Sequence, residues 1–357
     1  MVDSVLRGWF GGGMKATLLA LFVALLMVGC GEQTQKEVAE GEVKEKAAQI
    51  EAENDPSVPL LIPCEACGKE VSKKTEKCLS CGHPATDSVV AYKKAKPFGG
   101  LEALARIKEA KESGATKLFL SGNLISDPSL PKGLTKLEWL QLGGNEITDI
   151  SPLAELTKLE ELSLSDNQIT DLSPLKGLTN LEKLYLYNNK ISDISPLKGL
   201  TNLKELWFDD NEISDLSPLA VLTNLKELWL SDNQITDLSP LEGLTGLKGL
   251  SLGDNEISDL SPLKGLTNLE KLFLGDNRIT DISPLKGLTN LKTLRLDGNQ
   301  ITDVSPLAGL TNLKVLELDE NQIPEDQKAM LKKASWSLDL QGRRIRQRLT
   351  TPTAPPP

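Results

Sequence analysis

Histidine and aromatic residues are the scarcest components of this sequence. Its 357 residues include one histidine, His83, and 4% aromatic residues. A single histidine excludes metal centres built from several histidines, and its position excludes a Ser-His-Asp triad within residues 115–323. Hydrophobic residues still make up 39% of the chain, which excludes a disordered polypeptide. We therefore expect leucine to fill the interior in place of aromatic side chains.

An excess of positive charge is also missing. The formal net charge is −10 at pH 7, whereas proteins that bind duplex nucleic acid neutralise its phosphates with clustered Lys and Arg. Only the extreme C-terminus is locally basic, through Arg343, Arg344, Arg346 and Arg348. Nucleic acid is therefore not expected to be the main partner.

One long hydrophobic run lies near the N-terminus. Residues 16–28, ATLLALFVALLMV, follow Lys15 and end just before a Gly-Cys pair that includes Cys30. Thirteen residues are too few to span a bilayer comfortably, but this length and the preceding charge suit a signal peptide. The sequence MVGCG at residues 27–31 resembles the lipobox of bacterial lipoproteins, although it has methionine where leucine is commonest.

The lipobox resemblance implies removal of residues 1–29 as a signal peptide and diacylation of Cys30. The signal fits a start at Met14 better than one at Met1, because the cationic residue then lies close to the N-terminus. Since Gly31 rather than aspartate follows the cysteine, the resemblance implies a lipid anchor in the bacterial cell envelope, on the outer membrane or its periplasmic or extracellular face. The alternative is an uncleaved signal anchor with an unmodified cysteine.

Two segments are expected to connect folded parts of the chain. Residues 30–60 are rich in Glu, Lys, Ala and Gln and have almost no large apolar side chains. They cannot bury a core and are predicted to form a charged, flexible tether. Residues 93–100 contain Lys, Pro and two glycines and are predicted to form a hinge.

Four cysteines lie between these two segments, in residues 61–92. Cys64, Cys67, Cys78 and Cys81 form the pattern C-x2-C-x10-C-x2-C, and a glycine follows each pair. This pattern resembles a small zinc ribbon, in which each pair lies on a tight turn and four thiolates surround Zn²⁺. About thirty residues cannot fold on core burial alone, so the metal would supply folding free energy.

Alternatives to zinc remain open for these cysteines. An exported, oxidising location favours two disulfides, and iron in a rubredoxin-like site is a further alternative. His83 could replace a cysteine ligand, although a surface position before Pro84 explains it as well. Because the four thiolates fill all four coordination positions, the zinc is predicted to be structural rather than catalytic.

A 22-residue period organises most of the chain. Each copy has one asparagine, and these are Asn123, Asn145, Asn167, Asn189, Asn211, Asn233, Asn255, Asn277, Asn299 and Asn321. The accompanying pattern L-x-x-L-x-L-x-x-N-x-I is the leucine-rich repeat signature. It predicts an α/β solenoid over residues 115–323, with a parallel sheet on the concave side and short helical turns on the convex side.

Each residue of the repeat has an expected structural role. In the copy around Asn145, Leu140 and Leu142 should point inward from a short strand, while Trp139 and Gln141 point outward. The asparagine amide should turn into the coil and satisfy backbone groups of the sharp turn.

A Ser-Pro pair follows the strand in most copies, and its serine is expected to be the N-cap of a short helical turn. An aspartate two residues before each serine could belong to a cation ladder, but its constant place before the turn favours backbone capping. These aspartates are Asp149, Asp171, Asp193, Asp215, Asp237, Asp259, Asp281 and Asp303.

Both ends of the solenoid need a cover. Residues 101–114 are predicted to form an N-terminal cap helix, with Leu101, Leu104 and Ile107 on one face and Gly114 at its end. Residues 324–342 are predicted to cap the other end. Residues 343–357 are basic and then Pro-rich, and no fixed structure is expected there.

The repeat wording L-T-N-L, N-x-I-x-D and S-P-L is similar to the 22-residue repeats of bacterial internalins and of the eukaryotic phosphatase-regulating class. The similarity covers residues 115–323. It implies a solenoid that binds partners through its concave face. The identity of the partner differs among members of these families.

Outward strand positions are free to vary, so they should determine the partner. The residues four before each asparagine are Phe119, Gln141, Ser163, Tyr185, Trp207, Trp229, Ser251, Phe273, Arg295 and Glu317. Large aromatic residues therefore gather in the middle of the predicted sheet, whereas Phe208 replaces an inward leucine. The simpler interpretation is that Tyr and Trp have high strand propensity and merely cover the backbone.

An acidic rim surrounds the aromatic positions. We predict that partner binding involves a set of outward aromatic and acidic residues: Trp139, Tyr185, Tyr187, Trp207, Trp229, Phe273, Glu205, Asp209 and Glu227. An aromatic centre with an acidic rim indicates a partner with basic and apolar groups, such as a protein or peptide.

The sequence thus predicts a membrane-anchored, non-catalytic scaffold for protein or peptide recognition, with structural zinc as its cofactor. Two alternatives remain. The four-cysteine segment could be a metal or redox module with the array as its support, or the chain could be an adhesion or structural protein of the envelope.

Overall fold

The computed structural model describes residues 61–63, 70–72, 100–129, 134–327 and 329. The chain divides into two compact units, Met1–Lys96 and Pro97–Pro357. In the first unit, β1 (Leu61–Pro63) pairs antiparallel with β2 (Glu70–Ser72), and Pro63 lies opposite Glu70. The four paired cysteines, Cys30 and the predicted signal peptide, tether and C-terminal tail lie outside the described residues.

The second unit begins with helix α5 (Gly100–Ser113) and continues as a ten-stranded parallel sheet in chain order. Neighbouring strands pair in a register that places each residue beside the one 22 positions later. The strands are β3 (Lys117–Phe119), β4 (Trp139–Gln141), β5 (Glu161–Ser163), β6 (Lys183–Tyr185), β7 (Glu205–Trp207), β8 (Glu227–Trp229), β9 (Gly249–Ser251), β10 (Lys271–Phe273), β11 (Thr293–Arg295) and β12 (Val315–Glu317).

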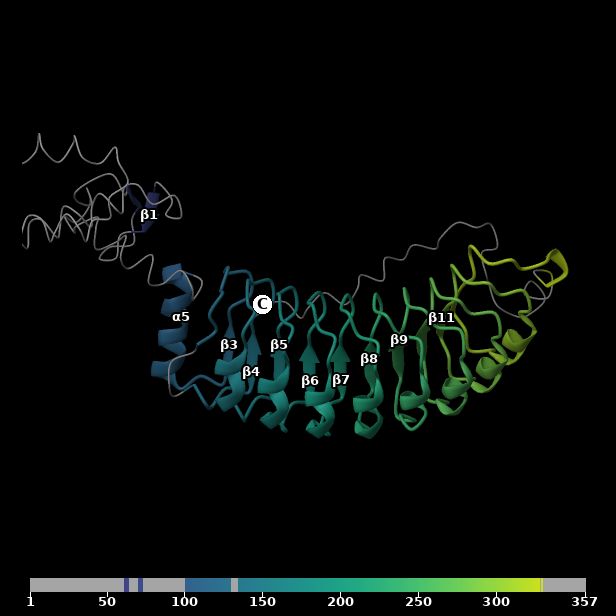
Figure 1. The fold of residues 1–357 in the computed structure, drawn as a ribbon, viewed down its shortest axis with the longest axis horizontal. Helices are drawn as coiled ribbons and strands as arrows, with labels where there is room; N and C mark the ends of the chain where they lie inside the picture. Colours follow the sequence, from purple (N-terminus) through teal and green to yellow (C-terminus); the bar gives the residue numbers. More distant parts are fainter. Residues whose placement is uncertain (1–60, 64–69, 73–99, 130–133, 328, 330–357) are drawn as a thin grey trace, which may run out of the picture. The chain divides into compact units, whose positions relative to one another are not determined.

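Short 3-10 helices follow the strands, as Figure 1 shows. They are η3 (Ser151–Glu155), η4 (Ser173–Gly177), η5 (Ser195–Gly199), η6 (Ser217–Val221), η7 (Ser239–Leu241), η8 (Ser261–Gly265), η9 (Ser283–Gly287) and η10 (Ser305–Gly309). This arrangement of strands and short turns confirms the predicted solenoid.

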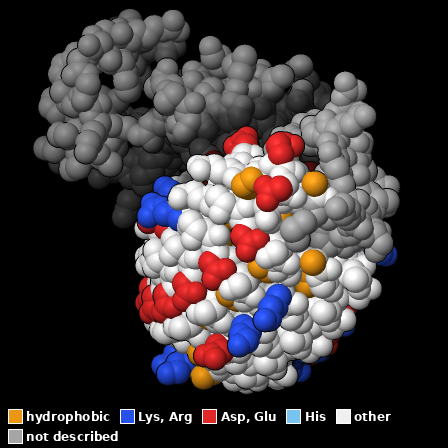
Figure 2. All heavy atoms as spheres, turned by 90° about the vertical axis from the view of Figure 1, so that its right-hand side faces the viewer, with side chains coloured by type: hydrophobic (Ala, Val, Ile, Leu, Met, Phe, Trp, Pro, Cys, Tyr) orange, Lys and Arg blue, Asp and Glu red, His pale blue; other side chains and the backbone are white. Residues whose placement is uncertain are grey.

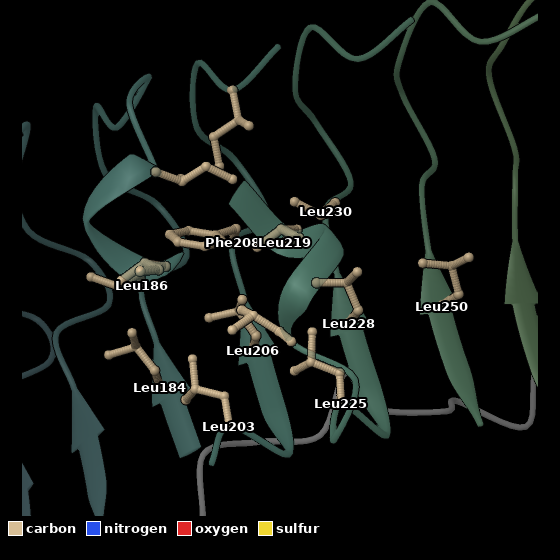
Figure 3. Close-up of a cluster of buried hydrophobic side chains, with 14 of the residues drawn as sticks. Leu184, Leu186, Leu203, Leu206, Phe208, Leu219, Leu225, Leu228, Leu230 and Leu250 are labelled. Carbon is tan, nitrogen blue, oxygen red and sulfur yellow. The ribbon is translucent and has the colours of Figure 1, made fainter. Parts of the chain in front are cut away.

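Leucine forms the interior of every coil. Leu140 and Leu142 are fully buried, and so is Phe208, which confirms its expected inward position. In Figure 3, Phe208 lies among Leu186, Leu219 and other leucines from neighbouring coils. The core is therefore one continuous apolar layer, in which each coil covers the next.

The repeated asparagines connect adjacent coils, as predicted. Asn211 Oδ1 accepts a hydrogen bond from the Ile191 amide at 3.0 Å. Its Nδ2 donates to the carbonyls of Leu186 and Phe208, both at 3.0 Å. The same contacts recur in the neighbouring repeats, so one buried amide replaces the backbone partners that the turn removes.

The aspartate before each Ser-Pro pair caps the turn, which confirms the capping role. Asp171 Oδ1 accepts the Ser173 amide and Oδ2 accepts the Ser173 hydroxyl, both at 2.8 Å. The backbone hydrogen bond from Ser173, followed by the one from its hydroxyl, lowers the pKa of Asp171. The expectation that serine itself is the N-cap was wrong. Leu172 occupies the N-cap position of η4, and Ser173 already lies in the helix, where its hydroxyl donates to the charged acceptor behind it.

The N-terminal helix buries only part of the face expected. Ile107 is buried in α5 as predicted, together with Ala103 and Ala110, whereas Leu104 is only half-buried. Two alanines let the helix backbone lie close to the first coil, which a leucine face would hold further away. Gly114 follows the helix with a φ of 65°, as expected for a glycine that ends it.

The C-terminal end of the sheet is less covered in the described residues. All three residues of β12 are half-buried. The side chain of Gln327 accepts a hydrogen bond from the Val304 amide at 3.2 Å. Residues 328 and 330–342 of the predicted cap lie outside the described part, so that prediction stays open.

A second row of asparagines leads to a stability prediction. Their Nδ2 atoms each donate to a threonine carbonyl of the preceding repeat at 2.9 Å, in Asn180, Asn202, Asn224, Asn268, Asn290 and Asn312. Gly246 interrupts this row. Its Cβ would lie 3.5 Å from the Thr223 carbonyl oxygen and 2.8 Å from Nζ of the flexible Lys226.

We expect Gly246→Asn to raise the free energy of unfolding by about 0.5–1.5 kcal/mol, because it adds one hydrogen bond and reduces the freedom of the unfolded chain. Denaturant unfolding measures the change. Gly243→Asn is the control, since it lies outside the row. A destabilised Gly246→Asn variant would show that the Lys226 side chain cannot move aside to make room for the new asparagine.

Candidate partner-binding face

Four aromatic side chains form a continuous row on the outward face of the sheet. We call Tyr185, Trp207, Trp229 and Phe273 the aromatic ladder. Tyr185 meets Trp207 edge to face, with ring centroids 5.6 Å apart. Trp207 stacks on Trp229 at 5.0 Å, and Trp229 meets Phe273 at 5.6 Å. The register of the parallel strands creates this row, because it places successive outward residues side by side.

The last contact of the ladder crosses an intervening strand. Trp229 lies on β8 and Phe273 on β10, and Ser251 of β9 lies between them. Ser251 is only 4% exposed, so the two larger rings close over it. Beyond Phe273, the Arg295 guanidinium lies 5.2 Å from the ring centroid and pairs with Glu317 at 3.2 Å.

The ladder rings are half-buried rather than exposed, because they cover one another's faces. The sequence could not show this overlap. Nε1 of Trp207 and Nε1 of Trp229 are buried and have no hydrogen-bond partner among the described residues. Nearly all buried donors in proteins are paired, so these two indole groups are exceptions.

Carboxylates line one side of the ladder. Glu205 accepts the Tyr185 hydroxyl at 3.2 Å and pairs with Lys183 at 3.0 Å. Burial, followed by the charges of Glu205 and Glu161, raises the pKa of Tyr185 well above its ordinary value. Burial also raises the pKa of Glu161 and of Glu227. The same column holds Lys117, Lys183 and Lys271, so lysines and glutamates are equal in number on this side of the face.

Asp209 lies on the other side of the ladder. Its Oδ1 accepts the Ser231 amide at 3.0 Å, and Ser231 Oγ lies 2.6 Å from Ser251 Oγ. Burial raises the pKa of Asp209 to about 6, against the lowering effect of these hydrogen bonds. Further Asp and Glu side chains form a row on the end of the molecule shown in Figure 2, with Lys and Arg side chains beside the lower part of that row.

The raised pKa of Asp209 predicts a dependence of stability on pH. An acid with a raised folded-state pKa stabilises the fold below its unfolded value of 3.8, and this contribution is lost as pH rises through about 6. Asp209→Asn should therefore raise the free energy of unfolding by about 1–2 kcal/mol at pH 8 and change it little at pH 4.

Denaturant unfolding at the two pH values measures this effect. Asp171→Asn is a control of opposite sign: the lowered pKa of Asp171 means that its removal costs stability at pH 8. Equal effects of Asp209→Asn on stability at both pH values would contradict a raised pKa of Asp209 in the folded protein.

The structure brings seven of the nine predicted residues together: the four ladder residues with Glu205, Asp209 and Glu227. Trp139 stands apart on β4, where Lys117 Nζ lies 3.5 Å from its ring centroid. Tyr187 lies beyond the end of β6 and has no ring contact with the ladder among the described residues. Burial and the nearby Asp166 raise its pKa.

Four contributors to this face lie outside the predicted binding set: Ser251, Lys271, Arg295 and Glu317. Sequence reasoning placed Ser251, Arg295 and Glu317 in the outward column without a binding role, and it missed Lys271. They occupy the same 22-residue columns, so the register contained the signal, but only the side-chain contacts show their roles. In the described residues, no helix is long and apolar enough to cross a membrane, and no group of His, Cys, Asp or Glu is placed to hold a metal ion.

Comparisons with known proteins agree with this architecture. Overlapping matches to the family model "Leucine Rich repeats (2 copies)" run from residue 135 to residue 328. The solved internalin InlF of Listeria monocytogenes is 32% identical, with 66% of this chain and 87% of that chain covered and a TM-score of 0.56. Internalin C2 of the same organism is 39% identical, with coverages of 62% and 92% and a TM-score of 0.52.

A leucine-rich repeat protein of Leptospira interrogans is 28% identical, with coverages of 63% and 67% and a TM-score of 0.55. No curated protein matches the chain. The family matches cover more than half of the sequence, and the solved relatives share its fold. The chain belongs to the leucine-rich repeat family and is internalin-like in its repeats.

Proposed function

We propose that this protein is a membrane-anchored, non-catalytic scaffold that recognises a protein or peptide through the concave, strand-bearing face of its repeats. Leucine-rich repeat proteins serve as recognition scaffolds for other proteins. The observation that carries the proposal is the aromatic ladder on the strand face. Clustered Trp and Tyr are typical of the residues that contribute most to binding at protein interfaces.

The geometry of the ladder favours a polypeptide over a ligand that stacks on aromatic rings. Tyr185, Trp229, Phe273 and Arg295 cover ring faces along the row. A ligand therefore meets ring edges, which carry partial positive charge. Backbone carbonyls of an extended segment are acceptors that suit these edges.

A surface location supports this function. The internalin and Leptospira relatives indicate a surface or extracellular protein. The lipobox at residues 27–31 would attach the chain to the membrane through Cys30, so that the repeats face partners outside the cytoplasm.

Site-specific crosslinking in intact cells tests the proposal. A photoreactive amino acid at Ser163, beside Tyr185 on the strand face, should capture a specific partner. The same amino acid at Lys198, in η5, is the control. Capture from both positions, or from neither, would contradict recognition through the strand face.

Structural zinc in the first unit is a second proposal, supported by the β1–β2 pair. Pro63 and Glu70 lie opposite each other, and the sequence between them contains Cys64 and Cys67. A C-x2-C pair between two paired strands suits two thiolate ligands, and Cys78 and Cys81 would complete the set. Metal analysis and intact mass of the purified chain distinguish one bound zinc from iron or from two disulfides.

A further inference from the structure

Strand β9 differs from its neighbours because its outward positions have almost no side chains. Gly249, Ser251 and the following Gly253 are all buried. Side chains of β8 and β10 close over them: Glu227 Oε1 lies 3.9 Å from Lys271 Nζ, and Trp229 meets Phe273. Since β8 and β10 are about 10 Å apart, these contacts are possible only because β9, which lies between them, has no large outward side chain. We call this row of small residues the β9 notch.

Glu227 occupies the notch without a full set of partners. Its carboxylate lies where a side chain at position 249 would be, since a Cβ on Gly249 would clash with Glu227 Oε2. Oε2 is buried and makes no hydrogen bond of ordinary geometry among the described residues, and neither does the neighbouring Trp229 Nε1. Burial raises the pKa of Glu227, the charge of Lys271 lowers it, the charge of Glu205 raises it further, and the adjacent Trp229 side chain, acting as a donor, lowers it.

Lys271 neutralises Glu227 only weakly. Their separation of 3.9 Å is long for an ion pair, and the Lys271 side chain is 49% exposed. Such a pair is worth at most about 1 kcal/mol, so an incoming cation can replace it. The notch therefore holds a carboxylate that Lys271 and the Trp229 indole satisfy only weakly.

We propose that the β9 notch is a specificity subsite that takes the cationic side chain, arginine or lysine, of an extended segment of the protein partner. The inference rests on the proposed function of the strand face. The ligand cation displaces Lys271 and donates to the Glu227 carboxylate. The aromatic ladder on either side takes apolar groups of the same segment.

Binding of short labelled peptides to the purified full chain tests the subsite. The probes are three dye-labelled peptides, identical except for a central arginine, lysine or citrulline, flanked by leucines. Citrulline keeps the shape of arginine but removes its charge. Fluorescence anisotropy should show at least about tenfold tighter binding for a cationic peptide than for the citrulline peptide. Equal affinity for all three would overturn the proposal.

Variants at the notch give opposite expected effects. Glu227→Gln should remove the preference for a cation, whereas Lys271→Gln should increase the affinity for the cationic peptide by about two- to fivefold, because it removes the competing ammonium group. Glu161→Gln is the matched control, since this buried glutamate occupies the same column outside the notch. Gly249→Ala should also weaken binding, because it displaces the Glu227 carboxylate.

Thermal unfolding confirms that each variant is folded before its affinity is interpreted. Unchanged selectivity in folded Glu227→Gln, or weaker binding by Lys271→Gln, would contradict the subsite. Failure of this inference is distinct from failure of the proposed function. If crosslinking from Ser163 still captures a partner while the three peptides bind equally, the face recognises proteins without a cation subsite at β9.

Discussion

Asn211→Ala is expected to lower the free energy of unfolding by about 3–4 kcal/mol. The substitution removes the acceptor of the Ile191 amide and three donations to the carbonyls of Leu186, Phe208 and Asp209. The carbonyls of Leu186 and Phe208 keep a second asparagine each. The Ile191 amide, by contrast, loses its side-chain acceptor. This buried donor without a partner accounts for most of the loss of stability.

Denaturant unfolding of the variant measures the effect. Asn224→Ala is the matched control, because its exposed amide makes one hydrogen bond, at 2.9 Å, to the Thr201 carbonyl. We expect that control to cost about 1 kcal/mol or less. Since stability in repeat proteins depends on contacts between neighbouring coils, Asn211→Ala should also separate the unfolding of the two halves of the array. Similar losses for both variants would contradict the proposed importance of the buried row.

Trp207→Ala is expected to weaken binding of the partner captured by crosslinking at least about 30-fold. Trp207 is the central member of the ladder, in contact with Tyr185 on one side and Trp229 on the other. Its removal takes away a large contact surface and an unpaired indole donor, and it frees both neighbouring rings to move. Titration of the partner by calorimetry measures the affinity.

Two further variants separate the causes of this loss. Trp207→Phe keeps an aromatic ring but removes the N–H, so it should lose part of the affinity if the indole donates to the ligand. Phe119→Ala is the matched control, in the same column on β3 but outside the ladder. We expect its affinity to stay within about threefold of the original chain. Full affinity in folded Trp207→Ala would instead assign the ladder to stability alone.

The repeat period made most of the solenoid predictable. Each copy has the same residue types at the same positions, so the inward leucines, the buried asparagine and the capping aspartate could be identified from their spacing. The prediction that serine is the N-cap was wrong. It relied on the frequent occurrence of Ser-Pro at helix starts, where serine is the N-cap and proline the first helical residue. Spacing could not show that Asp171 already provides the cap and leaves Ser173 inside the turn.

The candidate site was less predictable than the fold. The columns of outward residues followed from the period, which is why Tyr185, Trp207 and Trp229 could be grouped. The contacts between these side chains could not be predicted from the period. The approach of Trp229 to Phe273 depends on the small size of Ser251, and the position of Glu227 depends on the absence of a side chain at Gly249.

The sequence by itself determined that the chain contains a leucine-rich solenoid, which residues face inward and in which columns the variable residues stand. A fixed 22-residue period encodes these features locally, within each copy. Only the tertiary structure decided that the ladder rings cover one another, that two indole donors remain unpaired and that β9 forms a notch. These features arise from side-chain volumes on three adjacent strands, and therefore from residues that the chain brings together from different repeats.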